Sequence, residues 1–315
     1  MNKAKRGYFV PVWLVLLNLI IFLHASSATA QNKNYAGDFL SIGVGARALG
    51  MGGAFAAVAD DASAAYWNPA GLSFISNIEV TMIHLNTNSL QKYDFVNYAQ
   101  YIEDIGAFAV SYIRLSVDQI PLTQDTPDIK GYFENSENAI LVSGGSRIFK
   151  GVAVGATFKY LFGGFSSGVD ASFSGWGLDL GVLFKPIRQL KLGLNLQDIT
   201  GTTVQWQNTV TEPTNTIPVN VKIGGAFSQR IKAIDSLITL AIDADTKYDL
   251  RTHGGLELWY KNTIVGRAGF VSQQAISKPQ VTLGAGFIAF FVELDYAYVG
   301  YELSPLNYFS VIARF

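Results

Sequence analysis

The chain has no cysteine, few charged residues and no long apolar run beyond its start. Charged side chains make up 15% of the 315 residues, well below the ~25% of an average soluble domain. The lack of cysteine fits an exported protein that does without disulfides. After the first thirty residues no stretch approaches the ~20 apolar residues of a membrane helix. Mean hydropathy is nevertheless +0.24, so the apolar residues must be interleaved with polar ones.

Residue patterns of catalytic and metal sites are also missing. His24 belongs to the N-terminal segment, and His84 and His253 are isolated, without the spacing of metal ligands. No Gly-x-Ser-x-Gly elbow is present, although a serine and a histidine that meet only on folding remain an alternative. Residues 43–48 match a dinucleotide fingerprint formally, but no apolar strand precedes them and no βαβ unit follows. We therefore expect a protein that is not an enzyme and has no cofactor or metal.

The first thirty residues have the three parts of a secretory signal peptide. Basic residues at positions 3, 5 and 6 precede an apolar core at Phe9–Leu23, and Ala28-Thr29-Ala30 is a small-residue cleavage site. A retained membrane helix is the alternative, but the core is short for a span. We expect the mature chain to start at Gln31. The mature chain then carries fewer basic than acidic residues and has no basic patch, which argues against binding of nucleic acid.

The remainder of the chain, from about Ile78, alternates between apolar and polar residues. Phe158 and Tyr160 face one way, for example, whereas Thr157 and Lys159 face the other. A period of two indicates strands rather than helices. We expect about fourteen strands, many as long as the ~9–11 residues of a tilted membrane strand. Their centres lie near Val80, Val96, Val110, Leu141, Thr157, Leu180, Leu194, Lys222, Leu240, Leu256, Arg267, Gly284, Leu294 and Val311.

The connections between these strands alternate in length. Short connections lie near residues 103–104, 150–151, 186–187, 261–262 and 289, and long ones at 119–133, 197–217, 248–252, 272–279 and 300–306, with 230–235 intermediate. If the first strand starts in the periplasm, the short connections are periplasmic and the long ones external. This pattern and an even strand number predict an all-β fold, a transmembrane antiparallel barrel of about fourteen strands.

The two faces of the strands differ in a way that suits a membrane barrel. The polar face carries charges that we expect to form structural ion pairs in the lumen: Lys159, Asp179, Lys191, Lys222, Asp243, Glu257, Arg267, Glu293, Asp295 and Arg314. The apolar face carries aromatic residues near strand ends, such as Trp176, Phe184, Tyr260, Phe270, Phe290, Tyr296 and Tyr298, as in lipid-facing girdles. A soluble β-sandwich, with its polar face outward, is the alternative.

The last strand ends in an aromatic residue. Phe309, Val311, Ala313 and Phe315 share one face. Such a strand resembles the sorting signal read by outer-membrane barrel-assembly machinery, although any β protein can end in a buried strand. In combination with the signal peptide it predicts a Gram-negative type of outer membrane as the location, with outer-membrane lipid and the assembly machinery as partners.

The stretch between the signal peptide and the strands is glycine-rich. Residues 45–55 read Gly-Ala-Arg-Ala-Leu-Gly-Met-Gly-Gly-Ala-Phe, and residues 59–72 read Ala-Asp-Asp-Ala-Ser-Ala-Ala-Tyr-Trp-Asn-Pro-Ala-Gly-Leu. Both closely resemble the N-terminal signature of the PorV/PorQ family of outer-membrane proteins and, more distantly, the hatch of FadL-type fatty-acid transporters. The resemblance implies a fourteen-stranded barrel with this segment folded inside. We expect a signal peptide at 1–30, a plug with short helices at 31–75 and a barrel at 76–315.

Local chemistry agrees with a plug. Asp60 or Asp61 can cap a short helix through Trp67, which Asn68 ends because it precedes Pro69; a metal pair is the alternative for the two carboxylates. Glycines permit close approaches of the backbone, and here they are Gly45, Gly50, Gly52, Gly53 and Gly71. In a lumen, Arg47 needs a carboxylate partner. On facing alone the candidates are Glu257, Glu293 and Asp295.

Two functions follow from the resemblance. A plugged barrel of FadL type implies transport of small apolar molecules. PorV-type members imply instead a non-transporting platform or shuttle that binds secreted protein cargo in type IX-like secretion. In that case the long connections at 119–133 and 197–217 would be the docking surface.

Overall fold

The structure is a computed structural model that describes residues 37–87, 91–123, 128–166, 171–247, 249–274, 278–302 and 304–315. The expected signal peptide lies outside these residues. Four short helices come first: η1 (Asp38–Ile42), α2 (Ala46–Gly50), α3 (Ala64–Trp67) and η2 (Pro69–Phe74). In the described part of the chain, no helix has the length and apolar character needed to cross a membrane.

Strands make up the remainder, and their bounds are β1 (Ile78–Thr87), β2 (Gln91–Ile102), β3 (Gly106–Thr123), β4 (Ile129–Phe149), β5 (Val152–Ser166), β6 (Ser172–Phe184), β7 (Leu190–Gln197), β8 (Thr202–Gln207), β9 (Thr214–Ile217), β10 (Asn220–Ile231), β11 (Ser236–Asp245), β12 (Arg251–Tyr260), β13 (Ile264–Gln273), β14 (Gln280–Ala289), β15 (Val292–Val299) and β16 (Leu306–Arg314). A short helix, η3 (Lys232–Ile234), joins β10 to β11.

Fourteen strands, β1–β7 and β10–β16, close into an antiparallel barrel. Strand β16 pairs with β1 from Glu79 opposite Arg314 to His84 opposite Phe309, which leaves neither strand with a free edge. The predicted barrel is therefore confirmed, and the alternative of a β-sandwich is wrong. Each of the fourteen predicted strand centres falls in a different barrel strand, because the side-chain period of two is fixed by the pleat.

The outer surface of the barrel is apolar. Residues from ten strands contribute to it, each with 40–53% of its surface exposed: Val96, Val110, Val142, Phe158, Leu180, Leu240, Leu256, Leu283, Leu294 and Val311. Their neighbours in sequence point inward, and Lys159, next to Phe158, is only 4% exposed. An exposed apolar surface of this extent marks a region that contacts lipid or protein rather than water.

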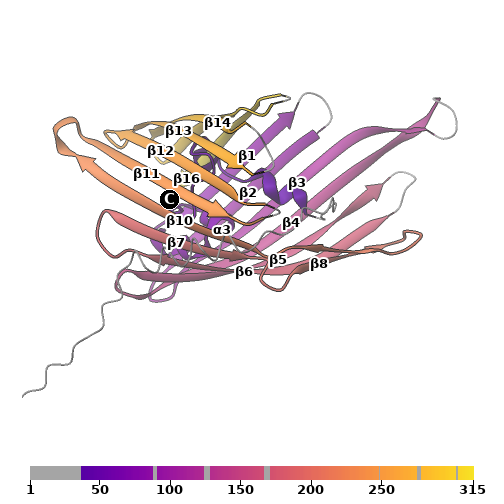
Figure 1. Cartoon of the computed structure of the whole chain (residues 1–315), viewed down its shortest axis with the longest axis horizontal. Helices are drawn as coiled ribbons and strands as arrows, with labels where there is room; N and C mark the ends of the chain where they lie inside the picture. Colours follow the sequence, from indigo (N-terminus) through magenta and orange to yellow (C-terminus); the bar gives the residue numbers. More distant parts are fainter. Residues whose placement is uncertain are drawn as a thin grey trace, which may run out of the picture. The chain divides into compact units, whose positions relative to one another are not determined.

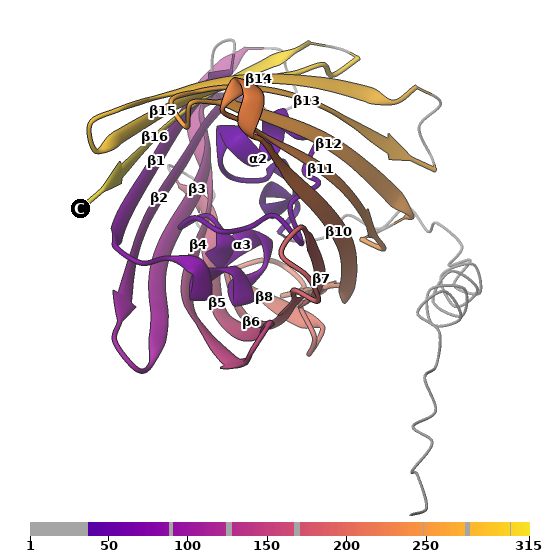
Figure 2. The same cartoon turned by 90° about the vertical axis from the view of Figure 1, so that its left-hand side faces the viewer.

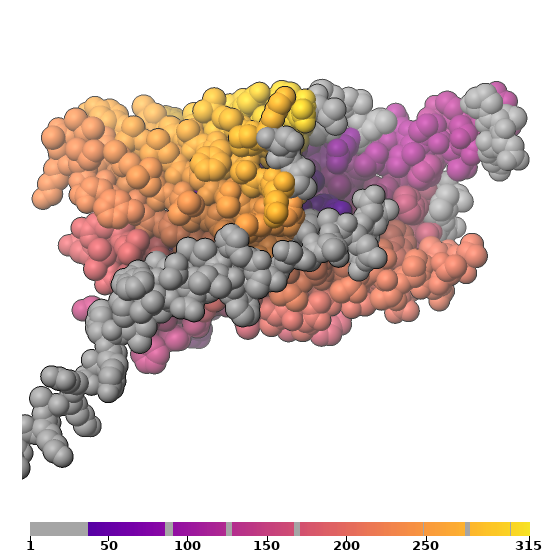
Figure 3. All heavy atoms as spheres, in the orientation of Figure 1, coloured from indigo at the N-terminus to yellow at the C-terminus, as the bar shows by residue number. Residues whose placement is uncertain are grey.

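The barrel has two different ends. The short connections, Ile78 and Phe315 lie at one, which we call the turn end, and the long connections lie at the other, the loop end (left and right in Figure 1). At the loop end, the magenta β3–β4 and salmon β8–β9 hairpins reach further than the yellow strands (Figure 3).

Two predicted loops turned out to contain strands. In place of a loop at 119–133, β3 continues to Thr123 and β4 begins at Ile129, and the predicted loop at 197–217 holds the β8–β9 hairpin, which pairs with β6. Packing of β8 explains the hairpin. Trp206 lies 6.0 Å from Phe165 and 5.0 Å from Phe173 between ring centroids, and Val204 is fully buried, so the hairpin has a buried side that the polar and proline residues around it obscured. The extended ends of β3 and β4 pair with each other, with Ile120 opposite Phe133.

The N-terminal segment fills the barrel. Figure 2 looks in from the turn end and shows the indigo helices α2 and α3 surrounded by strands. We call the described residues 37–75 the plug. Helix α2 packs against β13–β16, and η2 packs against β3–β6. The wall is glycine-rich where the plug backbone touches it, since a Cβ on Gly193 would lie 2.2 Å from Ala56 O and one on Gly269 would lie 2.4 Å from Gly52 N.

Candidate functional site: a plugged lumen with two cavities

Arg47 joins the plug to the barrel wall. From α2, its Nε and Nη2 donate to Glu257 on β12 at 2.9 and 3.1 Å, a bidentate pair. Its Nη1 donates to Asp60 at 2.8 Å and to Asp61 at 2.9 Å. Glu257 was one of the three candidate partners, whereas the two aspartates were not predicted to bind Arg47. Three carboxylates around one guanidinium fix the position of α2 in the lumen.

The other two candidates bind different arginines. Arg267 on β13 contacts Asp295 at 2.5 Å and Glu293 at 3.5 Å, and also Glu257 at 2.8 Å. Arg314 on β16 contacts Glu293 at 2.7 Å and, across the closure of the barrel, Glu79 at 3.0 Å. The wall therefore carries one continuous network of ion pairs from β12 to β1. The alternation of the sequence predicted that these side chains face the lumen, but it did not predict which of them form ion pairs.

The start of α3 differs in detail from the prediction. Ser63, not an aspartate, occupies the N-cap position. Asp61 Oδ1 accepts from the Ser63 backbone N–H at 2.9 Å, while Asp60 Oδ2 faces Lys191 Nζ at 3.0 Å. Asp61 thus binds the first turn of α3, and Asp60 binds a basic residue of the wall. The helix ends at Trp67 as expected, with Asn68 extended.

Asn68 fastens the plug to itself and to the wall. Its Nδ2 donates to Ala56 O at 2.7 Å, and its Oδ1 accepts from Ala70 N–H at 3.2 Å.

The ten plug residues singled out from the sequence all lie in the plug. All are buried apart from Arg47 and Asp60, which are partly exposed: Gly45, Arg47, Gly50, Gly52, Gly53, Asp60, Asp61, Asn68, Pro69 and Gly71.

Wall residues on β10–β12 hold the middle of the plug. Asp243 on β11 accepts from the backbone N–H groups of Phe55 and Ala56, both at 2.7 Å. Lys222 Nζ on β10 lies 4.6 Å from the Trp67 ring and 3.4 Å from Gly53 O. These contacts tie the plug backbone to the barrel at many points, which makes the plug a packed part of the fold.

A separate buried ion cluster lies toward the loop end. Lys159 Nζ on β5 lies 2.7 Å from Asp179 on β6 and 2.6 Å from Asp198. Asp198 was not predicted to be luminal, because it follows the last alternating residue of β7. Buried Lys247 lies nearby, in the β11–β12 connection. Burial lowers the pKa of Lys247 to about 8, although Asp198 acts in the opposite direction.

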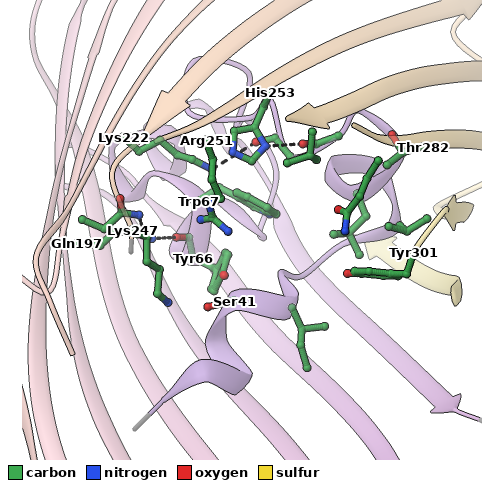
Figure 4. Close-up of a pocket in the computed structure, with 18 residues that line it drawn as sticks. Ser41, Tyr66, Trp67, Gln197, Lys222, Lys247, Arg251, His253, Thr282 and Tyr301 are labelled. Atoms are coloured by element: carbon green, nitrogen blue, oxygen red, sulfur yellow. Dashed lines mark hydrogen bonds between the residues drawn. The ribbon is translucent and has the colours of Figure 1, made fainter. Parts of the chain in front are cut away.

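The loop-end cavity, of about 100 Å³, lies between the plug and β10–β15. Figure 4 shows Lys222, Arg251 and His253 above Trp67, with Tyr66 and Ser41 below. His253 Nε2 lies 2.8 Å from Asp245, which also binds Arg251 at 2.9 Å. Other residues that line the cavity are Ile42, Leu49, Gly52, Gly53, Gln197, Asn220, Lys247, Val271, Gln280, Thr282, Val299 and Tyr301. A small molecule with an apolar body would find both apolar contacts and hydrogen-bonding groups here.

Part of this lining was missed from the sequence. His253 was taken as an isolated histidine, yet its Nδ1 lies 2.6 Å from Gly52 O in the plug. The signal was present in the alternation, since residues 251, 253 and 257 share the inward face of one strand. Tyr66 and Tyr301 carried no such signal, because neither lies in a barrel strand.

The turn-end cavity, of about 290 Å³, lies on the opposite side of the plug. It is lined by Arg47, Val58, Asp60, Phe74, Lys185, Arg188, Gln189, Lys191, Ala226, Ser228, Leu237, Thr239, Glu257 and Trp259. No residue lines both cavities. Along β10, Lys222 faces the loop-end cavity and Ala226 the turn-end cavity, so the plug separates the two cavities.

The residues of the last strand that were predicted to form a sorting signal face outward. Their exposed fractions are 62% for Phe309, 43% for Val311 and 64% for Phe315.

Known proteins provide independent comparisons. The model of the uncharacterised protein family UPF0164 matches residues 22–175, which include the plug and the first five strands. No curated protein matches the chain.

Solved structures match nearly the whole chain. The monoaromatic hydrocarbon channel CymD has a TM-score of 0.59 at 14% identity, and the Ralstonia pickettii toluene transporter TbuX has 0.57 at 13%; each match covers 87% of this chain and 98% of the other. A Pseudomonas aeruginosa FadL homologue has a TM-score of 0.53 at 13% identity and covers 84% and 97%. Because the sequence identities are this low, the structural similarity establishes the fold alone. The chain has the architecture of FadL-type plugged barrels.

Proposed function

We propose that this chain is an outer-membrane barrel, exported by a signal peptide, that passes small apolar molecules past its plug. The observation that carries the proposal is a plug fixed between two separate cavities inside a barrel with an apolar outer surface. A barrel of fourteen strands is too wide for wall side chains alone to fill, and here the plug occupies the middle of the lumen and leaves a cavity on either side. Among the similar solved proteins, TbuX and TodX are toluene transporters and CymD is a monoaromatic hydrocarbon channel.

Uptake of an aromatic hydrocarbon tests this function. Cells that express the protein should accumulate radiolabelled toluene faster than cells that carry the empty vector. Membrane fractionation has to show that the protein is assembled in the outer membrane. Equal rates with assembled protein would contradict transport of this class of molecule.

A platform for secreted cargo, as the PorV/PorQ resemblance implies, is the second candidate. One observation favours it: the β3–β4 and β8–β9 hairpins extend beyond the other strands at the loop end (Figure 3). They carry exposed apolar residues, with Ile129 55%, Tyr132 56% and Val210 fully exposed. Mass spectrometry of the proteins and lipids that co-purify from solubilised membranes separates the candidates, since a platform should retain secreted proteins of one type.

A further inference from the structure

The turn-end cavity combines aromatic walls with an excess of positive charge. Four basic residues line it, Arg47, Lys185, Arg188 and Lys191, against two carboxylates, Asp60 and Glu257. Both carboxylates are already engaged. Asp60 binds Arg47 and Lys191, and Glu257 binds Arg47 and Arg267.

Two of the four cations form no salt bridge with a carboxylate of the described residues. Lys185 and Arg188 belong to the connection between β6 and β7, and within the described ranges neither makes a salt bridge. Cationic side chains at the mouth of a cleft with low-dielectric walls raise the local concentration of anions. The charge of this cavity is thus unbalanced on the side that opens to the turn end.

Most of the remaining lining is apolar. Phe74 of the plug and Trp259 of β12 contribute rings, and Val58, Ala226 and Leu237 contribute aliphatic surface. Lys191 Nζ lies 4.9 Å from the centre of the Phe74 ring. A ligand in this cavity therefore meets aromatic surface and basic groups within one small space.

We infer that the turn-end cavity binds a small amphipathic anion, a carboxylate on an aromatic or short aliphatic body. The volume of about 290 Å³ lies at the lower limit of the ~300–1,000 Å³ of pockets that hold drug-sized ligands, so the body must be small. The carboxylate is placed toward Lys185 and Arg188, where charge-assisted hydrogen bonds are available. This site goes beyond the proposed function, because binding at the turn end requires no passage through the barrel.

Fluorine NMR in nanodiscs of zwitterionic phosphatidylcholine tests the inference on the full barrel. The probe is 4-fluorobenzoate, and 4-fluorobenzyl alcohol is the neutral counterpart of similar size. We expect the anion to bind at least about ten-fold more tightly than the alcohol, and its affinity to fall with added salt, as expected for charges that solvent reaches. Equal affinity of the two probes, or no binding of the anion, would overturn the inference.

Matched charge-removal variants locate the site. Lys185→Ala with Arg188→Ala should weaken 4-fluorobenzoate binding by about ten-fold, as expected for lost charge-assisted hydrogen bonds. Lys232→Ala with Lys261→Ala removes the same charge from neighbouring connections that do not line the cavity, and should leave affinity unchanged. Equal losses in both double variants would show that only the overall field matters. Heat-modifiable gel mobility verifies that each variant is assembled.

A lipid headgroup offers the same anionic chemistry from a different source. Adding phosphatidylglycerol to the nanodiscs should leave 4-fluorobenzoate binding unchanged if the occupant is a soluble carboxylate. Strong competition by phosphatidylglycerol would assign the cavity to a lipid and contradict the inference.

Discussion

At the scale of single residues, the plug depends on buried charges whose partners come from distant parts of the chain. Arg47 contacts Glu257 across 210 positions of sequence, and its side chain is only 12% exposed. Removing one member of a buried ion pair leaves the other charge without compensation, which costs far more than losing a surface pair. Single substitutions therefore test the network directly.

Arg47→Ala should lower the free energy of unfolding by about 2–4 kcal/mol, somewhat less than the ~3–5 kcal/mol of a fully buried pair because Arg47 is partly exposed. Urea unfolding in lipid, followed by gel mobility, measures the change. The matched control is Arg230→Ala, which removes an exposed pair with Asp235 and should cost at most about 1 kcal/mol. Similar losses in both variants would show that the network contributes little.

Lys247 should make stability depend on pH in the alkaline range. Its pKa is lowered to about 8 in the fold from 10.5, and the charged groups around it are Asp198, Asp38, Lys159 and Arg251. Because the unfolded chain binds the proton more tightly, stability rises with pH between about 8 and 10.5. Lys247→Met removes the buried charge, so its advantage over wild type, on the order of 2–3 kcal/mol at pH 7, should shrink by pH 10. A constant difference between the two proteins would contradict this assignment.

Leu180 and Gly181 test the two faces of β6. Leu180 is 44% exposed on the outer surface, so Leu180→Arg should destabilise the barrel by about 2–4 kcal/mol if it lies near the midplane of a bilayer, whereas Leu180→Met should have little effect. From the sequence alone, Gly181→Ser would be tolerated as a luminal change. The structure predicts the opposite, since a Cβ there would lie 2.2 Å from Asn68 Oδ1. Gel-mobility midpoints compare the three variants, and a harmless Gly181→Ser would count against the plug position.

At the scale of elements, alternation located the fourteen barrel strands but not the β8–β9 hairpin. Barrel strands show a strong period of two because one face meets apolar surroundings and the other meets the plug. The hairpin packs through a few contacts such as Phe173 with Trp206, and most of its residues are polar, so its alternation is weak. In the same way, the sequence showed that Arg47 needs a carboxylate and which wall residues face it. It could not show that Asp60 and Asp61 of the plug would bind it too, because that depends on how the plug turns back on itself.

Replacing residues 203–216 with a short glycine-serine linker should leave the barrel closed. β7 pairs directly with both β6 and β10, so the hairpin is an addition at the loop end and not a part of the ring. Heat-modifiable mobility should persist in the variant. Loss of assembly would show that the hairpin is needed for closure, and loss of a co-purifying secreted protein would favour the cargo platform.

At the scale of the whole molecule, the barrel and the plug form one packed unit. Wall glycines give space to plug backbone, plug carboxylates bind wall cations, and the two cavities are separated by the plug. Passage of a molecule from one cavity to the other therefore requires part of the plug to move. We therefore propose that the plug controls passage.

A reversible crosslink between plug and wall tests whether the plug controls passage. The side chains of Asp60 in the plug and Lys191 on β7 meet at 3.0 Å, and both line the turn-end cavity. A short bifunctional methanethiosulfonate reagent can therefore bridge cysteines at these two positions. Because the chain has no cysteine of its own, Asp60→Cys with Lys191→Cys gives one defined crosslink, and the single variants treated with the same reagent are the controls. We predict that toluene uptake slows when the crosslink is formed and recovers on reduction. Equal uptake in both states, with the crosslink verified by mass spectrometry, would contradict control of passage by the plug.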